Sequence, residues 1–211
     1  LRRMIISHLR RFIFVAIPKT GTHSVRQALR LHLGAEDMEQ VGLFVSKRFP
    51  FAEFADIRHG HINLQQIRPC LDEGQFESYF KFAFVRNPYD RFVSYCAFMS
   101  RDTGQFAADA RGFMKHVLFR VRPQDHVLFK PQYSFLVDEN GELLADFVGR
   151  VEEIQSGYDV VCERLAVASA ELAVVNASQR GDYLQYYDDE LLQGVREYYQ
   201  DDFKLFGYAA D

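Results

Sequence analysis

Two segments of the chain repeat one pattern: a short apolar run, a break next to a proline, and then apolar residues at helical spacing. The first run is Phe12–Ile17, which is followed by the loop Pro18–Thr22 and by a helical pattern. The second run is Tyr79–Val85, after which Arg86–Pro88 leads into a helical pattern over Tyr89–Met99. Short β-branched and aromatic runs of this kind are typical of buried parallel strands. Strands that alternate with helices predict an α/β fold with a mainly parallel central sheet flanked by helices.

The remainder of the chain continues this alternation. Asn63 is predicted to cap a short helix, and Tyr133–Val137 and Leu143–Val148 flank Asp138–Gly141, which has the residues of a hairpin turn. Further helices are predicted over Leu64–Leu71, Gln105–His116, Ile154–Leu165 and Asp188–Tyr199. Arg120–Pro131, basic and with two prolines, is expected to be irregular. Because the sequence has no repeat and no linker, we expect one domain over residues 1–211.

Composition limits the partners of this chain. Its 211 residues carry a net charge of -4, which gives no reason to expect nucleic acid as a partner, so any anion site must be local. Three widely spaced cysteines argue against a disulfide framework and a reduced compartment is expected. No apolar run is long enough to span a bilayer or to form a signal-peptide core, and Met4 is a candidate natural start. We therefore expect a cytoplasmic protein of bacterial type without stable membrane insertion.

The loop Pro18–Thr22 has the features of an anion site. A strand that runs into a glycine-containing loop and a helix N-terminus brings unpaired backbone N–H groups and the helix dipole together. Lys19 adds a positive charge, and Thr20, Thr22 and Ser24 add hydroxyl donors. The lysine precedes the glycine, unlike in the triphosphatase loop GxxxxGK[ST], which argues against ATP or GTP hydrolysis. The alternative for this loop alone is a polar turn with a solvated lysine.

The end of the second strand offers another anion site. Arg86 lies at the carboxyl edge of that strand, and Ser94 lies about two turns into the following helix on a face that can look toward the same crevice. The planar guanidinium binds phosphate through two hydrogen bonds, so this site suits a second, separate phosphate. The alternative is an ion pair between Arg86 and Asp90 that caps the helix, and Arg91 is expected to form a surface pair of that kind.

These two segments resemble known motifs. Ile17–Ser24 resembles the 5′-phosphosulfate-binding motif of the sulfotransferase superfamily, and Phe84–Tyr95 resembles its 3′-phosphate-binding motif. The chain is most similar to the carbohydrate sulfotransferases, in the branch of the heparan and chondroitin uronyl 2-O-sulfotransferases and their bacterial relatives. The pattern from Asp146–Arg150 to Phe206–Tyr208 also resembles bacterial members, so the resemblance covers nearly the whole chain. It implies a P-loop-type domain and the donor 3′-phosphoadenosine 5′-phosphosulfate (PAPS).

The resemblance also implies roles for individual residues. Lys19 contacts the bridging oxygen and the sulfonate of the donor, where charge builds on the leaving oxygen and a fixed cation lowers the barrier. Ser178 and Arg180 are weaker candidates for donor contacts. They lie in a polar loop, and in family members this loop often closes over the nucleotide. The residues implied for donor binding are Pro18, Lys19, Thr20, Gly21, Thr22, His23, Ser24, Arg86 and Ser94.

An aliphatic hydroxyl acceptor also needs a base, which contributes about 10²–10⁴-fold to the rate of such reactions. In the uronyl 2-O-sulfotransferases a His-x-His pair between the two motifs supplies it, and its second histidine aligns with His61. We therefore predict His61 as base and His59 as a residue that positions the substrate. The alternative for a histidine in a polar loop is a cap or a surface residue. Glu53 is the rival base, because other branches of the superfamily use a glutamate.

The predicted function is transfer of a sulfuryl group from PAPS to a hydroxyl of a carbohydrate or glycosylated small molecule, in line and with a histidine base. No metal is predicted, because His59 and His61 lack a third ligand at suitable spacing and the reaction requires none. Two alternatives stay open. A P-loop small-molecule kinase is disfavoured by the position of Lys19, and a non-catalytic nucleotide-binding module would need neither Lys19 nor a base.

Overall fold

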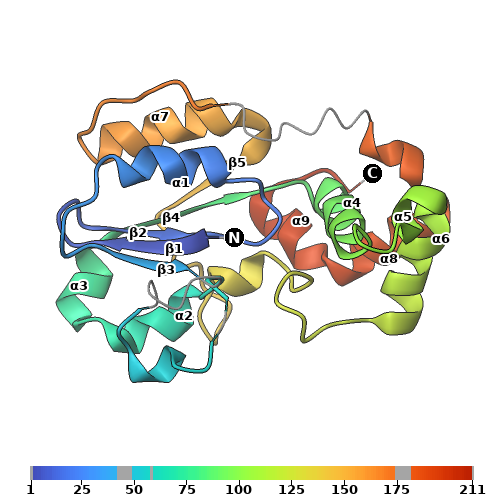
Figure 1. The fold of residues 1–211 in the computed structure, drawn as a ribbon, viewed down its shortest axis with the longest axis horizontal. Helices are drawn as coiled ribbons and strands as arrows, with labels where there is room; N and C mark the ends of the chain where they lie inside the picture. Colours follow the sequence, from blue (N-terminus) through green and yellow to red (C-terminus); the bar gives the residue numbers. More distant parts are fainter. Residues whose placement is uncertain (1, 42–48, 58, 174–181, 211) are drawn as a thin grey trace. The chain divides into compact units, whose positions relative to one another are not determined.

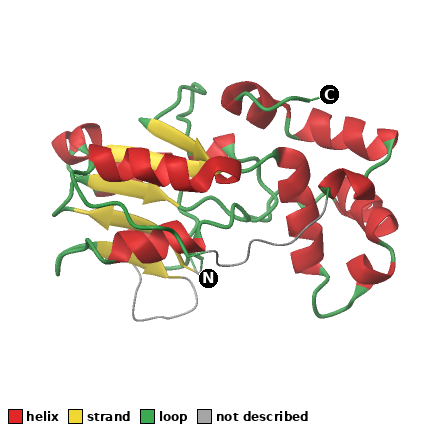
Figure 2. Cartoon of the chain, turned by 90° about the horizontal axis from the view of Figure 1, so that it is seen from above, coloured by secondary structure: helices red, strands yellow, loops and turns green. Residues whose placement is uncertain are grey.

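The computed structural model describes residues 2–41, 49–57, 59–173 and 182–210 (Figure 1). The chain forms two compact units. Unit 1 comprises Leu1–Val85 and Ser134–Asn176, and unit 2 comprises Arg86–Tyr133 and Ala177–Asp211. Unit 1 contains the sheet, whereas the described residues of unit 2 form helices and turns without a strand (Figure 2).

Unit 1 is built on a mixed sheet of five strands in the order β3-β1-β2-β4-β5. Strands β2, β4 and β5 are parallel, with Val15 opposite Ala83 and Phe84 opposite Gly149, while β1 is antiparallel to both β2 and β3. The prediction of a mainly parallel sheet is therefore wrong. The strands are β1 (Arg2–Ser7), β2 (Phe12–Val15), β3 (Met38–Val41), β4 (Phe80–Val85) and β5 (Phe147–Arg150).

The short connection between β1 and β2 explains why these two strands are antiparallel. Only His8–Arg11 separates β1 from β2, and so short a connection can join antiparallel strands but not parallel ones. Arg11 adopts a φ of 55° in this turn. Neither β1 nor β3 is predicted from the sequence, so the sheet gains two strands on the side of β2 that faces away from β4.

Helices cover both faces of the sheet. Helices α1 and α7 lie over one face, and α2 and α3 lie against the other (Figure 1). Asn63 caps α2 as predicted, since its side chain accepts a hydrogen bond from Gln66 N at 2.7 Å. Pro69 then changes the predicted helix into a 3-10 turn over Arg68–Cys70, because proline cannot donate a helical hydrogen bond. The bounds in unit 1 are α1 (His23–Arg30), α2 (Leu64–Ile67), α3 (Glu73–Ser78) and α7 (Ile154–Arg164), with 3-10 turns at Ala52–Phe54 and Val151–Glu153.

Phenylalanine dominates the core between the sheet and the pair α1 and α7. Phe84 is fully buried there, and its ring lies between two glycines. A Cβ atom on Gly149 would lie 2.6 Å from this ring, and one on Gly157 would lie 2.7 Å from it. These glycines are therefore needed for close approach of the ring to β5 and α7.

The predicted hairpin is only partly present. Gly141 has a φ of 82°, and Asp138 N donates to Glu142 O at 3.0 Å, so the turn forms as predicted. Its flanks pair only through one bridge between Val137 and Leu143, and Tyr133–Phe135 is a 3-10 turn. The predicted strand Leu143–Val148 is replaced by β5, which pairs with β4 rather than across the turn.

Unit 2 is helical. The predicted helix Gln105–His116 divides at Asp109, whose side chain caps α6 by accepting a hydrogen bond from Gly112 N at 2.9 Å. The chain continues from α6 into a π-helical turn, His116–Val121, which was not predicted. The helices are α4 (Pro88–Met99), α5 (Gln105–Ala108), α6 (Ala110–Lys115), α8 (Asp189–Tyr198) and α9 (Gln200–Phe206), with a 3-10 turn at Tyr183–Tyr186. Within the described part of the chain, no helix is long and apolar enough to cross a membrane.

Candidate active site

The loop after β2 is held in an unusual backbone conformation. Lys19 has a φ of 66° and Gly21 a φ of 72°. No atom would contact a Cβ atom on Gly21, so the left-handed backbone rather than lack of space requires glycine there. A non-glycine residue such as Lys19 in this region carries strain, which is typical of ligand-binding loops. Thr20 is 1% exposed and its hydroxyl donates to Ile17 O at 2.9 Å, so this hydroxyl stabilises the loop.

Helix α1 begins directly after this loop with an N-terminus that suits an anion. The N-cap residue Thr22 makes no side-chain capping hydrogen bond, and the first turn contains no acidic residue. Backbone N–H groups and the helix dipole make such an end electropositive. His23 Nδ1 lies 3.0 Å from Nη2 of the buried Arg26, which also pairs with Glu39 at 3.2 Å. Because a guanidinium only donates, the His23 Nδ1 atom accepts this hydrogen bond.

His61 lies beside the start of the same loop. It is 7% exposed, and its Nδ1 atom is 2.7 Å from Ala16 O, the carbonyl directly after β2. A carbonyl can only accept, so Nδ1 carries a proton, and in the neutral imidazole the lone pair is then on Nε2. The hydrogen bond therefore fixes the tautomer in which Nε2 can take up a proton.

The strands that were not predicted hold this histidine segment in place. Met4 N in β1 donates to Gly60 O at 3.1 Å, and the buried Gln40 in β3 donates from Nε2 to His59 O at 3.3 Å. The ring centroids of His59 and His61 are 6.3 Å apart. The edge of the sheet thus positions both histidines.

Glu53 has different surroundings. It is exposed in the 3-10 turn Ala52–Phe54 and lies next to Cys70. Burial raises the pKa of the Cys70 thiol, and the charge of Glu53 and a hydrogen bond to it raise this pKa further. Cys96 is fully buried, and burial raises its pKa well above the usual value. All three cysteines are free thiols.

In unit 2, Arg86 follows directly on the last residue of β4. Its Nε and Nη2 atoms both lie 2.6 Å from Asp90 Oδ2, so the ion pair that the sequence offered as an alternative is present. Asn87 caps α4 by accepting from Tyr89 N at 2.9 Å. Ser94 is 5% exposed on the same helix.

A buried amide holds the backbone of Arg86. The Oε1 atom of Gln132 accepts from Arg86 N at 2.9 Å, and its Nε2 atom donates to Arg86 O at 2.8 Å. Gln132 is fully buried and is held in turn by Asp202, which accepts from Gln132 N at 2.9 Å and from Tyr133 N at 2.8 Å. These residues are missing from the sequence predictions, because no local pattern marks a buried amide.

Buried charges surround this amide. Burial raises the pKa of Asp202, although the charge of Arg91 and the hydrogen bonds from Gln132 and Tyr133 oppose the rise. Arg91 is 2% exposed, and its Nη2 atom donates to the carbonyls of Leu128 at 3.2 Å and Lys130 at 2.9 Å. The prediction that Arg91 forms a surface ion pair is therefore wrong. This arginine is a buried donor to the segment that precedes Gln132.

Comparison with known proteins identifies the family. A model described as the sulfotransferase family matches residues 2–209. The chain belongs to the sulfotransferase family. It is 25% identical over 240 residues to carbohydrate sulfotransferase 14 of Homo sapiens and of Mus musculus, alignments that include 99% of this chain and 60% of each relative. The chain thus spans about 60% of the length of these curated relatives. No solved structure matches it significantly.

The predicted site residues divide between the two units. Unit 1 contains Lys19 with its loop and the histidines at 59 and 61, and the structure brings His61 next to that loop. Unit 2 contains Arg86 and Ser94 on neighbouring parts of the chain. Ser178 and Arg180, and Arg58 before the histidine pair, lie outside the described residues.

Proposed function

We propose that this sulfotransferase transfers a sulfuryl group from PAPS to a hydroxyl of a carbohydrate or glycosylated small molecule. The observation that carries the proposal is the hydrogen bond from His61 Nδ1 to Ala16 O, which holds this imidazole beside the start of the loop of Lys19 and makes Nε2 the basic nitrogen of its neutral form. The two curated relatives, both named carbohydrate sulfotransferases, support a carbohydrate acceptor.

The residues after β2 suit the phosphosulfate end of the donor. The α1 N-terminus lacks a side-chain cap, the loop has two left-handed residues, and Lys19 supplies a cation. We assign Pro18–Ser24 to this end, in a P-loop-type arrangement. The donor supplies a sulfuryl group whose leaving group is a phosphate, and the role of Lys19 is to stabilise the charge that appears on the bridging oxygen.

Arg86 and Ser94 are assigned to the 3′-phosphate of the donor. Asp90 Oδ2 lies 2.6 Å from both Nε and Nη2 of Arg86. This pair holds the guanidinium in one orientation, which lowers the entropy lost on binding. Ser178 and Arg180 remain candidates for closing over the nucleotide.

His61 is assigned as the base. In the transfer step the acceptor oxygen forms a bond to sulfur, the bond from sulfur to the phosphate oxygen breaks, and the acceptor proton goes to His61 Nε2. His59 is assigned to positioning of the acceptor, since its backbone carbonyl is fixed by Gln40. Glu53 is the rival base, and its exposed place next to Cys70 offers no comparable fixed geometry.

Transfer of labelled sulfate from PAPS to a panel of glycans, phenols and tyrosyl peptides tests the reaction. We expect glycans to be labelled and His61→Ala to lower kcat about 10²–10⁴-fold, as for other general bases. The exposed His116 provides the matched control His116→Ala. Labelling of tyrosyl peptides alone would contradict a carbohydrate acceptor, and an unchanged kcat in His61→Ala would transfer the base role to Glu53.

Binding of adenosine 3′,5′-bisphosphate, measured by calorimetry, tests the donor site. We expect Lys19→Ala and Arg86→Ala each to weaken binding about 10-fold or more, because each removes a charged hydrogen-bond donor. Lys204→Ala, at an exposed lysine of α9, is the control. Parent affinity in both variants would contradict the donor assignment. Stabilisation by magnesium ATP but not by the bisphosphate in a thermal-shift assay would favour the kinase alternative.

A further inference from the structure

A pocket of about 320 Å³ lies in unit 1, at the opposite end of β2 from the loop of Lys19. It is formed mainly by the turn between β1 and β2, the junction of α3 with β4, and the end of α7. Its volume is at the lower end of the ~300–1,000 Å³ typical of ligand sites, so it suits a small ligand. We call it the arginine pocket, because its charged lining residues are three arginines and two carboxylates, namely Arg10, Arg11, Arg164, Glu77 and Asp146.

Two of the arginines lie against one residue of β4. Phe80 N donates to Arg11 O at 2.9 Å, and the Arg164 guanidinium lies over the Phe80 ring with Cζ 5.6 Å from the ring centroid. A guanidinium that lies over a ring keeps its N–H groups in its own plane, where they can still bind an anion. Arg11 has a φ of 55°, a strained backbone conformation for an arginine, and strain of this kind is typical of ligand-binding segments. The fold therefore places arginines from distant segments around one small pocket.

The two carboxylates of the arginine pocket have cationic partners of their own. Glu77 Oε1 lies 3.1 Å from Arg68 Nη2. Asp146 Oδ2 lies 3.1 Å from Nζ of the buried Lys81 and accepts a hydrogen bond from Lys81 N at 2.7 Å. By contrast, the described part of the chain provides neither an ion pair nor a side-chain hydrogen bond for any of the three arginines. The pocket thus has three positive charges without a paired carboxylate among the described residues.

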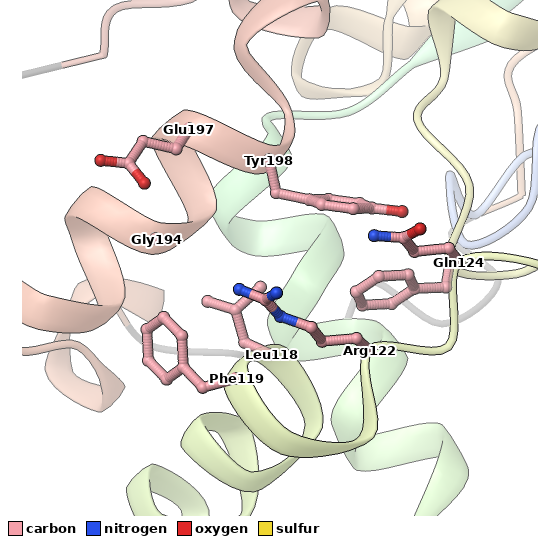
Figure 3. A pocket seen from close by; sticks show the side chains of 8 residues that line it. Leu118, Phe119, Arg122, Gln124, Gly194, Glu197 and Tyr198 are labelled. Carbon is pink, nitrogen blue, oxygen red and sulfur yellow. The ribbon is translucent and has the colours of Figure 1, made fainter.

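A pocket in unit 2 has a different balance of charge. Its volume is about 250 Å³, and its charged lining residues are one arginine and one glutamate, Arg122 and Glu197 (Figure 3). The glutamate offsets the charge of the arginine, so the charges of this pocket select no anion. In the arginine pocket the carboxylates are already neutralised by other cations, which leaves an excess of positive charge. Such an excess attracts anions that carry several charges.

We propose that the arginine pocket binds a diphosphate group, either as pyrophosphate or at the end of a small molecule. A carboxylate or a sulfate ester carries a single negative charge, and a phosphate monoester carries about 1.5–2 at pH 7, so none of these matches three guanidiniums. A diphosphate carries more charge, and the oxygens on its two phosphorus atoms can accept paired hydrogen bonds from more than one guanidinium. Among the described residues, none assigned to the donor or the acceptor lines this pocket, so the ligand occupies a site separate from that of the reaction.

Calorimetry on the full chain tests the ligand class without the transfer reaction. In about 150 mM NaCl, attraction between exposed charges is screened beyond about 8 Å, so non-specific binding is weak. We expect pyrophosphate to bind, and orthophosphate and sulfate to bind about 10-fold or more weakly, because each accepts fewer charged hydrogen bonds. Methyl diphosphate distinguishes the two sources: similar affinity would assign the pocket to diphosphate esters, and binding of pyrophosphate alone would assign it to the inorganic ion. Absence of pyrophosphate binding, or equal binding of sulfate, would overturn the proposal.

Two variants test whether the arginines carry this binding. Arg11→Gly removes one guanidinium and suits the left-handed backbone, so it should remain folded. Arg164→Gln removes the charge of an exposed side chain at the end of α7. We expect each variant to weaken binding of pyrophosphate about 10-fold, as for other charged hydrogen bonds. Arg196→Gln, at an exposed arginine of α8 in unit 2, is the matched control and should keep the parent affinity.

A variant of the Lys19 loop separates this site from the proposed donor site. We expect Lys19→Ala to retain the pyrophosphate affinity that Arg11→Gly and Arg164→Gln lose, because Lys19 lies beyond the other end of β2. Parent affinity in both arginine variants, or a loss only in Lys19→Ala, would overturn the pocket assignment. If the arginine variants lose binding but the parent labels no acceptor with PAPS, the pocket stands and the proposed function fails.

Discussion

The interactions that hold the Lys19 loop in unit 1 differ in kind from those that hold Arg86 in unit 2. The loop follows a strand of buried apolar side chains, and the buried hydroxyl of Thr20 donates within it to Ile17 O, three residues away. The backbone of Arg86 is held by Gln132, 46 residues away, and Gln132 is held by Asp202, a further 70 residues along the chain. The hydrogen bond within the loop is local and the strand before it is apolar, whereas the hydrogen bonds that hold Arg86 are non-local.

This difference indicates which substitutions should lower the stability of each candidate phosphate-binding site. Apolar burial is not directional, so a strand and its loop tolerate modest changes in neighbouring side chains. A buried polar network is directional, and the loss of one member leaves the others unpaired in a medium of low dielectric constant. We therefore expect unit 2 to lose more stability than unit 1 from the removal of a single polar group.

Asp202→Ala should have the largest effect. It removes the carboxylate that accepts hydrogen bonds from Gln132 N and Tyr133 N, and it leaves the buried charge of Arg91 without this partner. Breaking a buried charge network in this way costs about 3–5 kcal/mol in the free energy of unfolding. Urea denaturation measures this cost, with Asp201→Ala, at the exposed neighbour, as the control. A loss equal to that of the control would show that the network adds little to unit 2.

The parts of the fold that the sequence predicts correctly are those with a local signal. The apolar runs at β2 and β4, the breaks after them and the Asn63 cap all depend on residues within a few positions of one another. The π-helical turn and the break at Asp109 were missed, because the apolar spacing of Gln105–His116 is equally compatible with one continuous helix.

The parts that could not be predicted depend on distant partners. Strand β1 carries arginines at its start and becomes a strand because it pairs with both β2 and β3. Arg91 looks like a surface charge in sequence, and only the carbonyls of Leu128 and Lys130 make it a buried donor. The same holds for the site, where the sequence marks His61 but not the Ala16 carbonyl that selects its tautomer.

Gln132→Met should have the second-largest effect on the free energy of unfolding. Methionine keeps the volume but leaves the part-buried Arg86 N and Arg86 O without the amide, at about 1–3 kcal/mol in total. We also expect weaker binding of adenosine 3′,5′-bisphosphate than in the exposed control Gln200→Met, because Arg86 loses its fixed backbone. Denaturation and calorimetry measure the two effects. Loss of stability with parent affinity would separate the structural role of Gln132 from donor binding.

Gly149→Ala tests whether unit 1 is as tolerant as we expect. The added methyl group meets the ring of Phe84 at 2.6 Å, and Gly157 approaches the same ring closely, so the ring has little room to shift. Overpacking of this kind costs about 1–3 kcal/mol. Gly74→Ala is the matched control, since a Cβ atom there contacts nothing within 4 Å and alanine favours the helix. The double variant with Phe84→Leu should recover part of the loss, as a thermodynamic cycle would show. A loss above that of Asp202→Ala would reverse the proposed contrast.

Asp37→Asn should have the smallest effect on the free energy of unfolding. It changes a polar, hydrogen-bonded turn within unit 1. The carboxylate accepts hydrogen bonds from Ser7 Oγ at 2.6 Å, His8 N at 2.7 Å, Gly34 N at 2.8 Å and Leu9 N at 3.1 Å. Burial is the largest single influence and raises the pKa of Asp37, but these four hydrogen bonds together outweigh it and lower the pKa below 3.8. Because the substitution changes acceptors in a partly exposed turn, we expect a loss of about 1 kcal/mol at neutral pH.

The sign of the pKa shift of Asp37 fixes the pH at which this difference disappears. A carboxyl group whose pKa is lower in the folded than in the unfolded state contributes stability above its unfolded pKa, and loses it as pH falls through the folded value. The gap in unfolding free energy between parent and Asp37→Asn should therefore be constant from neutral pH down to about 5 and shrink as pH falls below 3.8. Urea denaturation across this range measures it, with Glu36→Gln at the exposed neighbour as control. A gap that widens on acidification would mean that burial, and not the hydrogen bonds, dominates at Asp37, and the turn would then resemble the buried carboxylate of unit 2.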